Sequence, residues 1–314
     1  MQTQKCPFFN LCGGCAYDFS DSSYQSDKLS TLPKIKYTHD AIWGKPGERR
    51  RADFAFLNGH FGFFRKQSKD LVNLDYCPNL VSEINDILPF VAKLPWIGTG
   101  SVLITKCENG IDIVVDSALP CFSNEFKTAV EKLPAQILRF VWNDKTIRQY
   151  KTPEIKFDNK FLEYPPRAFL QPTQETEKIL RDLVLGHIDG LQKVADLFCG
   201  LGNFTFATNA TGFDIFGNGI KRDLLKNPLS VKQLNNYNIV IMDPPRSGAE
   251  KQSKELSKSN VTKIIYVSCN PNTFVRDKNI LERGNYKIST IIPVDQFVGS
   301  QHWELFAVFT KISS

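Results

Sequence analysis

The stretch that decides the fold is VADLFCGLGNFT, at residues 194–205. Its first four residues, apolar apart from Asp196, predict a buried strand, and a glycine-rich turn follows directly. Gly200 and Gly202 let the backbone of such a turn approach a bound nucleoside closely. The turn lacks the Gly-Lys-Ser/Thr sequence of a phosphate-binding NTPase loop. We therefore expect an α/β fold with a nucleoside-containing cofactor here, whereas an ordinary strand and turn, with Cys199 as a packing residue, is the alternative.

Two more buried strands are expected downstream, and each leads to a side chain that can do chemistry. Residues 238–242 run into Asp243, and residues 264–267 lead to Cys269. Binding sites in open α/β sheets form at the carboxyl ends of the strands. A thiol there can act as a nucleophile, and a buried structural cysteine is the alternative. Glu304 precedes a last apolar run, either as a site residue or as a solvated edge carboxylate.

A cluster of thiols lies near the start of the chain. Cys6, Cys12 and Cys15 fall within ten residues, and Cys77, which Pro78 follows, is the best candidate for a fourth ligand. Four thiolates suit either zinc or an iron–sulfur cluster, and this spacing alone does not separate the two. Unrelated free thiols are the remaining alternative.

Length and composition are those of a soluble globular protein. The chain has 314 residues, of which 42% are hydrophobic and 23% charged, which suits about two domains. No apolar run reaches the ~18 residues of a membrane helix, and the first six residues lack the apolar core of a signal peptide. We expect a cytoplasmic protein, in which eight cysteines favour metal binding or chemistry over disulfides. The net charge of +6 suggests an anionic partner such as nucleic acid without deciding it.

The middle of the chain is basic and rich in expected strands. Residues 28–51 carry seven lysines and arginines, and strand patterns over residues 52–57 and 60–65 flank Asn58-Gly59, a strong hairpin signal. Aromatic side chains between cations can stack on bases while the cations hold phosphates; a half-buried sheet with a solvated basic edge is the alternative. Other strands are expected at residues 101–105, 111–115 (a second hairpin), 137–142, 147–150, 156–162 and 289–294, and helices at residues 80–94 and 173–188.

Taken together and in order, these motifs resemble the RNA uracil-C5 methyltransferases, the family of the bacterial ribosomal and transfer-RNA 5-methyluridine enzymes. The resemblance covers essentially the whole chain. It implies an α/β protein with three parts: an N-terminal iron–sulfur segment at residues 1–39, with its fourth ligand at 77, a central β-rich RNA-binding domain at residues 40–163, and a C-terminal Rossmann-like class I methyltransferase domain at residues 164–314.

The resemblance also implies roles for individual side chains. Cys269, in Ser-Cys-Asn-Pro, would be the nucleophile, and Glu304, in His-x-Glu, would be the base. A [4Fe–4S] cluster would be held by Cys6, Cys12, Cys15 and Cys77. Contacts with S-adenosylmethionine are expected from Gln171, Phe198, Gly200, Gly202, Asn203, Asp214, Asp223 and Asp243.

The chemistry of uracil explains these residue types. C5 of uracil is a poor nucleophile, but addition of a thiolate at C6 gives an enolate whose C5 can attack the methyl group of S-adenosylmethionine. A base must then remove the C5 proton so that the thiol can leave, and a carboxylate can do this. The target base must also be flipped out of its stack, and loops of folded RNA present such bases.

The chain departs from the family pattern after the glycine-rich turn. Only residues 206–221 separate the turn from Arg222-Asp223, where family members fit a strand, a full helix and an acid for the cofactor ribose. We expect a strand over residues 211–215 with Asp214 as that acid, and loss of the helix. The alternative is that Asp214 is a turn residue, which would leave Asp223 as the nearer cofactor contact. The usual first histidine of the C-terminal motif is also replaced, around Gly299.

The function expected from these observations is methylation of uridine C5 in structured RNA, most of all 23S rRNA, with tRNA as the alternative. An RNA cytosine-C5 methyltransferase is a rival, but its chemistry places a cysteine in the Asp-Pro motif, and residues 243–248 contain none. A catalytically inactive RNA-binding protein that keeps the cluster is a second rival. We expect a monomer that binds RNA and does not bind a membrane.

Overall fold

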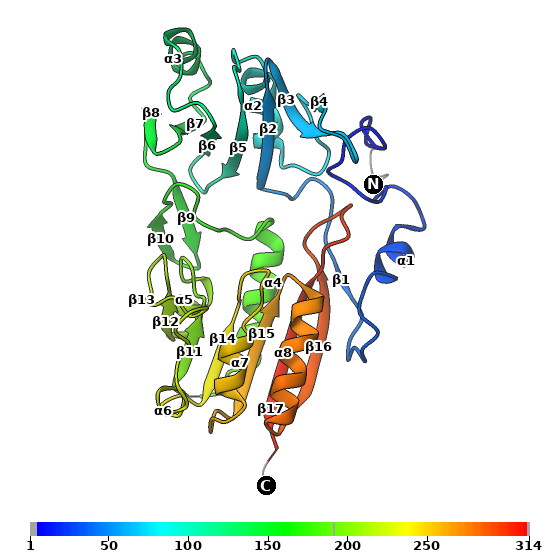
Figure 1. Cartoon of the computed structure of the whole chain (residues 1–314), viewed down its shortest axis with the longest axis vertical. Coiled ribbons are helices and arrows are strands. Elements are labelled where there is room, and N and C mark those ends of the chain that lie inside the picture. Colours follow the sequence, from blue (N-terminus) through cyan, green and yellow to red (C-terminus); the bar gives the residue numbers. More distant parts are fainter. Residues whose placement is uncertain (1–4, 191, 313–314) are drawn as a thin grey trace. The chain divides into compact units, whose positions relative to one another are not determined.

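The computed structural model describes residues 5–190 and 192–312, which form two compact units (Figure 1). The first unit takes in the chain up to Lys28, then Lys45–Gln174 and Val298–Gln301. The second contains Leu29–Gly44, Glu175–Phe297 and the chain from His302 onward. The boundaries expected at residues 39 and 163 stay predictions, as does the missing signal peptide, which depends partly on residues 1–4, outside the described part.

The second unit is built on one eight-stranded sheet whose order is β1-β16-β17-β15-β14-β11-β12-β13. Neighbouring strands from β15 to β13 run parallel, whereas β17 is antiparallel to both β15 and β16. The strands are β1 (Ile42–Trp43), β11 (Val194–Leu197), β12 (Thr211–Asp214), β13 (Ile220–Lys221), β14 (Ile239–Met242), β15 (Lys263–Ser268), β16 (Tyr286–Asp295) and β17 (Glu304–Lys311).

Both faces of this sheet are buried, which explains why its central strands are continuous apolar runs. Alternate residues of β14 enter two separate cores: Val240 and Met242 one, Ile239 and Ile241 the other. The first core is covered by α7 and α8, and the second by α4 and α5. The helices of this unit are α4 (Gln174–Leu185, whose first residue belongs to the first unit), α5 (Asn203–Thr208), α6 (Val231–Leu234), α7 (Glu250–Leu256) and α8 (Pro271–Arg283).

The first unit is a seven-stranded sheet of order β4-β3-β2-β5-β6-β7-β8, with a separate β9–β10 hairpin. The hairpin expected at Asn58-Gly59 is confirmed, since Leu57 pairs with His60 and both turn residues have positive φ. The elements are α1 (Tyr24–Leu29, whose last residue belongs to the second unit), β2 (Arg51–Leu57), β3 (His60–Phe64), β4 (Leu71–Asn73), α2 (Ser82–Ala92), β5 (Thr99–Lys106), β6 (Ile111–Ser117), α3 (Asn124–Glu131), β7 (Ile137–Trp142), β8 (Lys145–Gln149), β9 (Glu154–Phe157) and β10 (Lys160–Glu163).

The single strand expected over residues 156–162 is wrong. The chain reverses there: Asp158 has a φ of 53°, and Phe157 pairs with Lys160 across the turn. Asp158-Asn159 is a turn signal of the same kind as Asn58-Gly59. Among the helices of the described residues, none is long and apolar enough to cross a membrane.

Candidate active site

The pairing of β15 with β17 brings Cys269 near Glu304. The two strands run antiparallel as far as Ser268 against Leu305, Cys269 follows β15 directly, and Glu304 begins β17. A thiol and a carboxylate that lie 35 residues apart in sequence therefore lie at the same edge of the sheet, close enough for the charge of Glu304 to raise the pKa of the Cys269 thiol.

Glu304 is a buried side chain, 1% exposed, so the alternative of a solvated edge carboxylate is wrong. The side-chain amide of Gln296 donates to its Oε2 atom, and the hydroxyl of Thr176 donates to Oε1 of Gln296 at 3.4 Å. The Oε1 atom of Glu304 is buried and has no hydrogen-bond partner among the described residues. Burial raises the pKa of Glu304 well above its usual value, and the nearby Asp243 raises it further. This is the electrostatic setting of a general base held away from water.

Gln296 was missed by the sequence reasoning, although a signal was present. It follows Asp295 at the end of the apolar run IIPV, and it is 1% exposed. Buried amides need hydrogen-bond partners, so a glutamine in such a stretch indicates a polar group nearby.

Cys269 is half-buried at the end of β15. Burial raises the pKa of its thiol to about 12, with the charges of Glu304 and Asp243 acting in the same direction and Arg246 acting against them. Arg246 is thus the cation that favours the thiolate. Its guanidinium also lies 3.2 Å from Nδ1 of His302, so the Asp-Pro-Pro-Arg and His-x-Glu motifs meet next to the thiol.

Asp243 follows β14 and joins a group of acidic side chains at the carboxyl ends of the parallel strands. Burial raises its pKa, and Asp196 and Asp214 raise it further. Asp196, on β11, is fully buried, and its pKa is raised to about 7, mainly by that burial. The hydroxyl of Thr205 donates to Asp196 at 2.6 Å. The site is therefore short of positive charge as it stands, which favours a cationic ligand such as a sulfonium.

The glycine-rich turn has an unusual backbone. Gly200 and Gly202 have φ angles of 52° and 98°, and Phe198 adopts a positive φ of 64°. A large side chain in the left-handed region costs about 1–3 kcal/mol and is typical of functional sites. Gly217 lies so near the turn that an added Cβ would come within 1.8 Å of the carbonyl oxygen of Gly200.

Asp214 has features of both roles considered for it, an acid at the cofactor site and a turn residue. It ends β12, as expected, and one carboxylate oxygen accepts from the backbone N–H of Gly200 at 2.9 Å. The other accepts from the N–H of Phe216, also at 2.9 Å, which is the bond of a turn aspartate. Within the described residues β13 begins at Ile220 with no helix between, so the expected loss of the helix is confirmed.

Three other residues expected at the cofactor site have different surroundings. Asn203 begins α5 and accepts from Arg181 at 3.4 Å, while its amide nitrogen is buried without a partner among the described residues. Asp223 begins the turn that follows β13, where its carboxylate accepts from the N–H of Lys226, and it forms an ion pair with the Lys226 ammonium group at 3.4 Å. Gln171 is buried in the first unit, and its contact with the cofactor stays a prediction.

The four candidate ligand cysteines lie together in the first unit, all half-buried. Burial raises the pKa of Cys15 to about 12, and Cys77, Cys12 and Cys6 each raise it further. The Asn79 amide donates to the sulfur of Cys15 at 3.4 Å. No group of three or more metal-ligating side chains in the described residues is arranged to hold a metal ion.

Comparison with known proteins places this arrangement among RNA methyltransferases. Residues 221–312 match the family model described as tRNA (uracil-5-)-methyltransferase. An RNA methyltransferase of Brucella melitensis is 34% identical over 99% of this chain and 85% of its own length. The 23S rRNA (uracil(1939)-C(5))-methyltransferase RlmD of Erwinia tasmaniensis is 26% identical over 98% and 82%. The crystal structure of the Pyrococcus abyssi tRNA (uracil-54, C5)-methyltransferase, solved with S-adenosyl-L-homocysteine, shares the fold at a TM-score of 0.70 and 20% identity, covering 90% of this chain and 81% of that one.

Proposed function

Because the chain belongs to the RNA uracil-C5 methyltransferase family, whose members use S-adenosylmethionine, we propose that it methylates C5 of a uridine in structured RNA, with 23S rRNA as the substrate. The observation that carries the proposal is the pairing of β15 with β17, which brings Cys269, directly after β15, near Glu304, at the start of β17. A nucleophile and a base on opposite strands, with the glycine-rich turn at the same edge of the sheet, suit addition, methyl transfer and elimination at one base.

In this reaction Cys269 attacks C6 of the uracil as the thiolate. Because the pKa of its thiol is raised to about 12, the proton must leave as the substrate binds, and Arg246 offsets part of that cost. S-adenosylmethionine supplies the methyl group, and its positive charge suits a site lined by Asp196, Asp214 and Asp243. Glu304 then takes the C5 proton on its Oε1 atom, while the bond from Gln296 holds the other oxygen still.

The choice of 23S rRNA over tRNA is supported by the RlmD relative, which covers 98% of this chain. The likeness to the tRNA enzyme of Pyrococcus abyssi shows a shared fold and carries no argument about the substrate at 20% identity.

We also propose that Cys6, Cys12, Cys15 and Cys77 hold a [4Fe–4S] cluster. The donor set fits: four thiols lie within electrostatic reach of one another, and although burial raises the pKa of both Cys15 and Cys77, the charge of Arg49 offsets part of that rise. Four cysteine thiolates hold a cluster of this kind, and these four side chains would be its ligands. N–H groups of Gly14 and Asn79 donate to two of the sulfurs, at 3.3 and 3.4 Å. The cluster would tie residue 6 to residue 77.

The substrate proposal is tested by methyl transfer in vitro. Protein purified without oxygen is incubated with labelled S-adenosylmethionine and either unmodified 23S rRNA or unmodified tRNA transcripts. Label that appears as 5-methyluridine in 23S rRNA alone supports the proposal. Label in tRNA alone would assign the chain to the alternative substrate, and binding of S-adenosylmethionine without transfer to either RNA would overturn the proposed activity.

A further inference from the structure

A small pocket in the first unit is lined by converging cations and lies away from the catalytic residues in sequence. Its empty volume is about 260 Å³, most of which is open to the solvent at its mouth. The enclosed part is small, so the pocket suits a single compact group. The lining residues are Arg50, Lys106, Cys107, Glu108, Ile155, Lys156, Phe157 and Gln174.

The floor of the pocket is apolar and its backbone is held by hydrogen bonds. Cys107, Ile155 and Phe157 are each at most 3% exposed. The N–H of Glu108 donates to the carbonyl oxygen of Glu154 at 2.7 Å, which joins the end of β5 to β9. The N–H of Lys106 donates to Arg50 at 2.8 Å. The pocket is therefore formed before any ligand enters.

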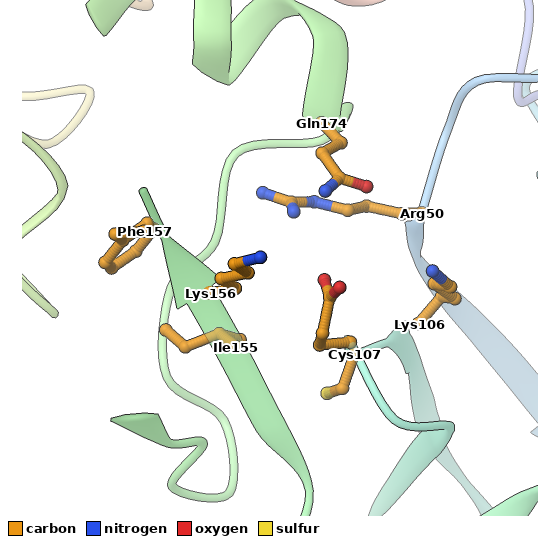
Figure 2. A pocket seen from close by; sticks show the side chains of 8 residues that line it. Arg50, Lys106, Cys107, Ile155, Lys156, Phe157 and Gln174 are labelled. Carbon is orange, nitrogen blue, oxygen red and sulfur yellow. The ribbon is translucent and has the colours of Figure 1, made fainter. Parts of the chain in front are cut away.

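Positive charge dominates the polar lining. Three cations, Arg50, Lys106 and Lys156, line the pocket with one carboxylate, Glu108, and the ammonium group of Lys106 also pairs with Glu83 at 3.6 Å. Arg50 is 7% exposed, and its Nε donates to the carbonyl oxygen of Gln171 at 3.1 Å, which fixes the plane of the guanidinium. Figure 2 shows the guanidinium extending below Gln174 toward Lys156, whose ammonium group points into the same space. Pre-positioned cations of this kind favour a phosphate, with its several acceptor oxygens.

An exposed aromatic ring lies next to the pocket. Phe161, on β10, is 57% exposed and pairs across the hairpin with Lys156. The ammonium group of Lys156 lies 5.1 Å from the centre of this ring. A cation that can hold a phosphate, beside a ring on which a base can stack, is the combination found in grooves for single-stranded nucleic acid.

We infer that this pocket binds a phosphodiester of the RNA substrate and that Phe161 stacks on an adjacent base. The inference rests on the proposed RNA substrate and adds a binding subsite to it. The phosphate would accept from Arg50, Lys106, Lys156 and Gln174. Such a contact positions the RNA without reading its sequence.

The test compares Lys156→Gln with Lys127→Gln, which removes the same charge from the exposed face of α3. Filter binding of unmodified 23S rRNA transcript is measured across a series of salt concentrations. We expect Lys156→Gln to weaken binding about fivefold to tenfold and to reduce the salt slope by about 0.7–0.9, the value of one lost phosphate contact. Lys127→Gln should match the unchanged protein in both measurements. Equal affinity and slope for Lys156→Gln and the unchanged protein would overturn the inference.

Two further measurements test the role of Phe161 and the alternative of a free anion in the pocket. Phe161→Ala should weaken the same RNA about tenfold while leaving the salt slope unaltered, because stacking involves no counterion; an unchanged affinity would remove Phe161 from the subsite. Inorganic phosphate at matched ionic strength should compete with RNA only weakly. If it binds the pocket as tightly as RNA does, the site serves a free anion and the inference fails. If the unchanged protein binds no RNA, the proposed function fails instead.

Discussion

Two cysteines occupy comparable positions in the second unit and have different surroundings. Cys199 follows β11 and Cys269 follows β15, both at carboxyl ends of strands in the parallel part of the sheet. Burial raises the pKa of each thiol to about 12. By sequence context and by burial alone, either could be taken for the nucleophile.

What separates them is the element opposite. Cys269 lies near the carboxylate of Glu304, with Arg246 as a nearby cation. Carboxylates also lie near Cys199, since Asp196 and Asp214 raise the pKa of its thiol, but its sulfur is packed against backbone: a Cβ added at Gly212 or Gly219 would lie 2.9 or 2.6 Å from it. The thiol with a base across from it can do chemistry, and the thiol against glycines fills space. Five variants test this contrast.

The largest effect is expected for Cys269→Ala. RNA carrying 5-fluorouridine at the target should trap the unchanged protein covalently, because fluorine at C5 cannot be removed as a proton. Cys269→Ala should abolish the trapped band on a denaturing gel and lower methyl transfer to background. A trapped complex with this variant would move the nucleophile elsewhere.

Glu304→Gln should stop the reaction at a later step than Cys269→Ala does. Addition and methyl transfer precede the step that needs the base, so the adduct should accumulate on RNA with ordinary uridine. Turnover should fall about 10²–10⁴-fold, the usual contribution of a positioned base. If no adduct accumulates while fluorinated RNA is still trapped, another group must remove the C5 proton.

Asp214→Ala should weaken S-adenosylmethionine binding at least about tenfold, which corresponds to ~1.4 kcal/mol. A carboxylate bound to a ribose diol makes charge-assisted hydrogen bonds, and this carboxylate also holds the N–H of Gly200. Calorimetry with the cofactor checks the change, with RNA affinity as the control that should stay constant. Unaltered cofactor affinity would show that Asp214 acts only as a turn residue, and Asp223 would then be the nearer candidate for the cofactor contact.

Gln296→Leu should shift the pH dependence of turnover. The hydrogen bond from Gln296 lowers the pKa of Glu304, which burial has raised. Without that bond the pKa rises further, so the carboxyl stays protonated to higher pH and the acidic limb of the profile moves upward. We expect turnover to fall several-fold at neutral pH and to recover in alkaline buffer. An equal loss of turnover at all pH values would indicate that Gln296 has only a structural role. Gln296→Glu is not a suitable control because it adds a charge.

The smallest effect is expected for Cys199→Ala, the counterpart of the first variant. Trapping of fluorinated RNA should be retained, with less than about a threefold change in rate. Loss of the sulfur should cost about 1 kcal/mol of the free energy of unfolding, which a denaturant titration measures. Lost trapping in a folded Cys199→Ala protein would break the distinction between the two thiols.

A sixth comparison concerns the N-terminal thiols. Protein prepared anaerobically should carry about four irons per chain, and Cys77→Ser should lose the iron and its visible absorbance. Cys121→Ser, at an exposed cysteine outside the cluster, is the matched control. Stoichiometric zinc without iron would contradict the cluster.

The features that sequence predicted well were local ones. The strands that end near Met242 and Ser268 contain uninterrupted apolar runs because both of their faces are buried, and the strand that ends at Leu197 is apolar apart from Asp196. The turn at Asn58-Gly59 requires the positive φ that these residues tolerate. The position of Cys269 at the end of a strand followed from the same pattern.

What sequence did not predict depends on distant partners. Glu304 is buried because its strand, β17, lies between β15 and β16. The sequence around Glu304 does not by itself distinguish β17 from an edge strand. Gln296 acquires a role only because Glu304 and Thr176 lie on either side of its amide. No pattern in residues 42 and 43 indicates a strand, since β1 exists only by pairing with β16.

That pairing has a consequence for how the protein is made. Thr38 and Ile291 exchange backbone and side-chain hydrogen bonds across 253 residues. At a synthesis rate of roughly 5–20 residues per second, residues 29–44 wait about 13–50 seconds on the ribosome before their partner strand is made. Most multidomain chains complete their N-terminal domain first, but here the second unit closes only when nearly the whole chain has emerged. The nascent N-terminal segment therefore needs protection from pairing with other edges during that interval.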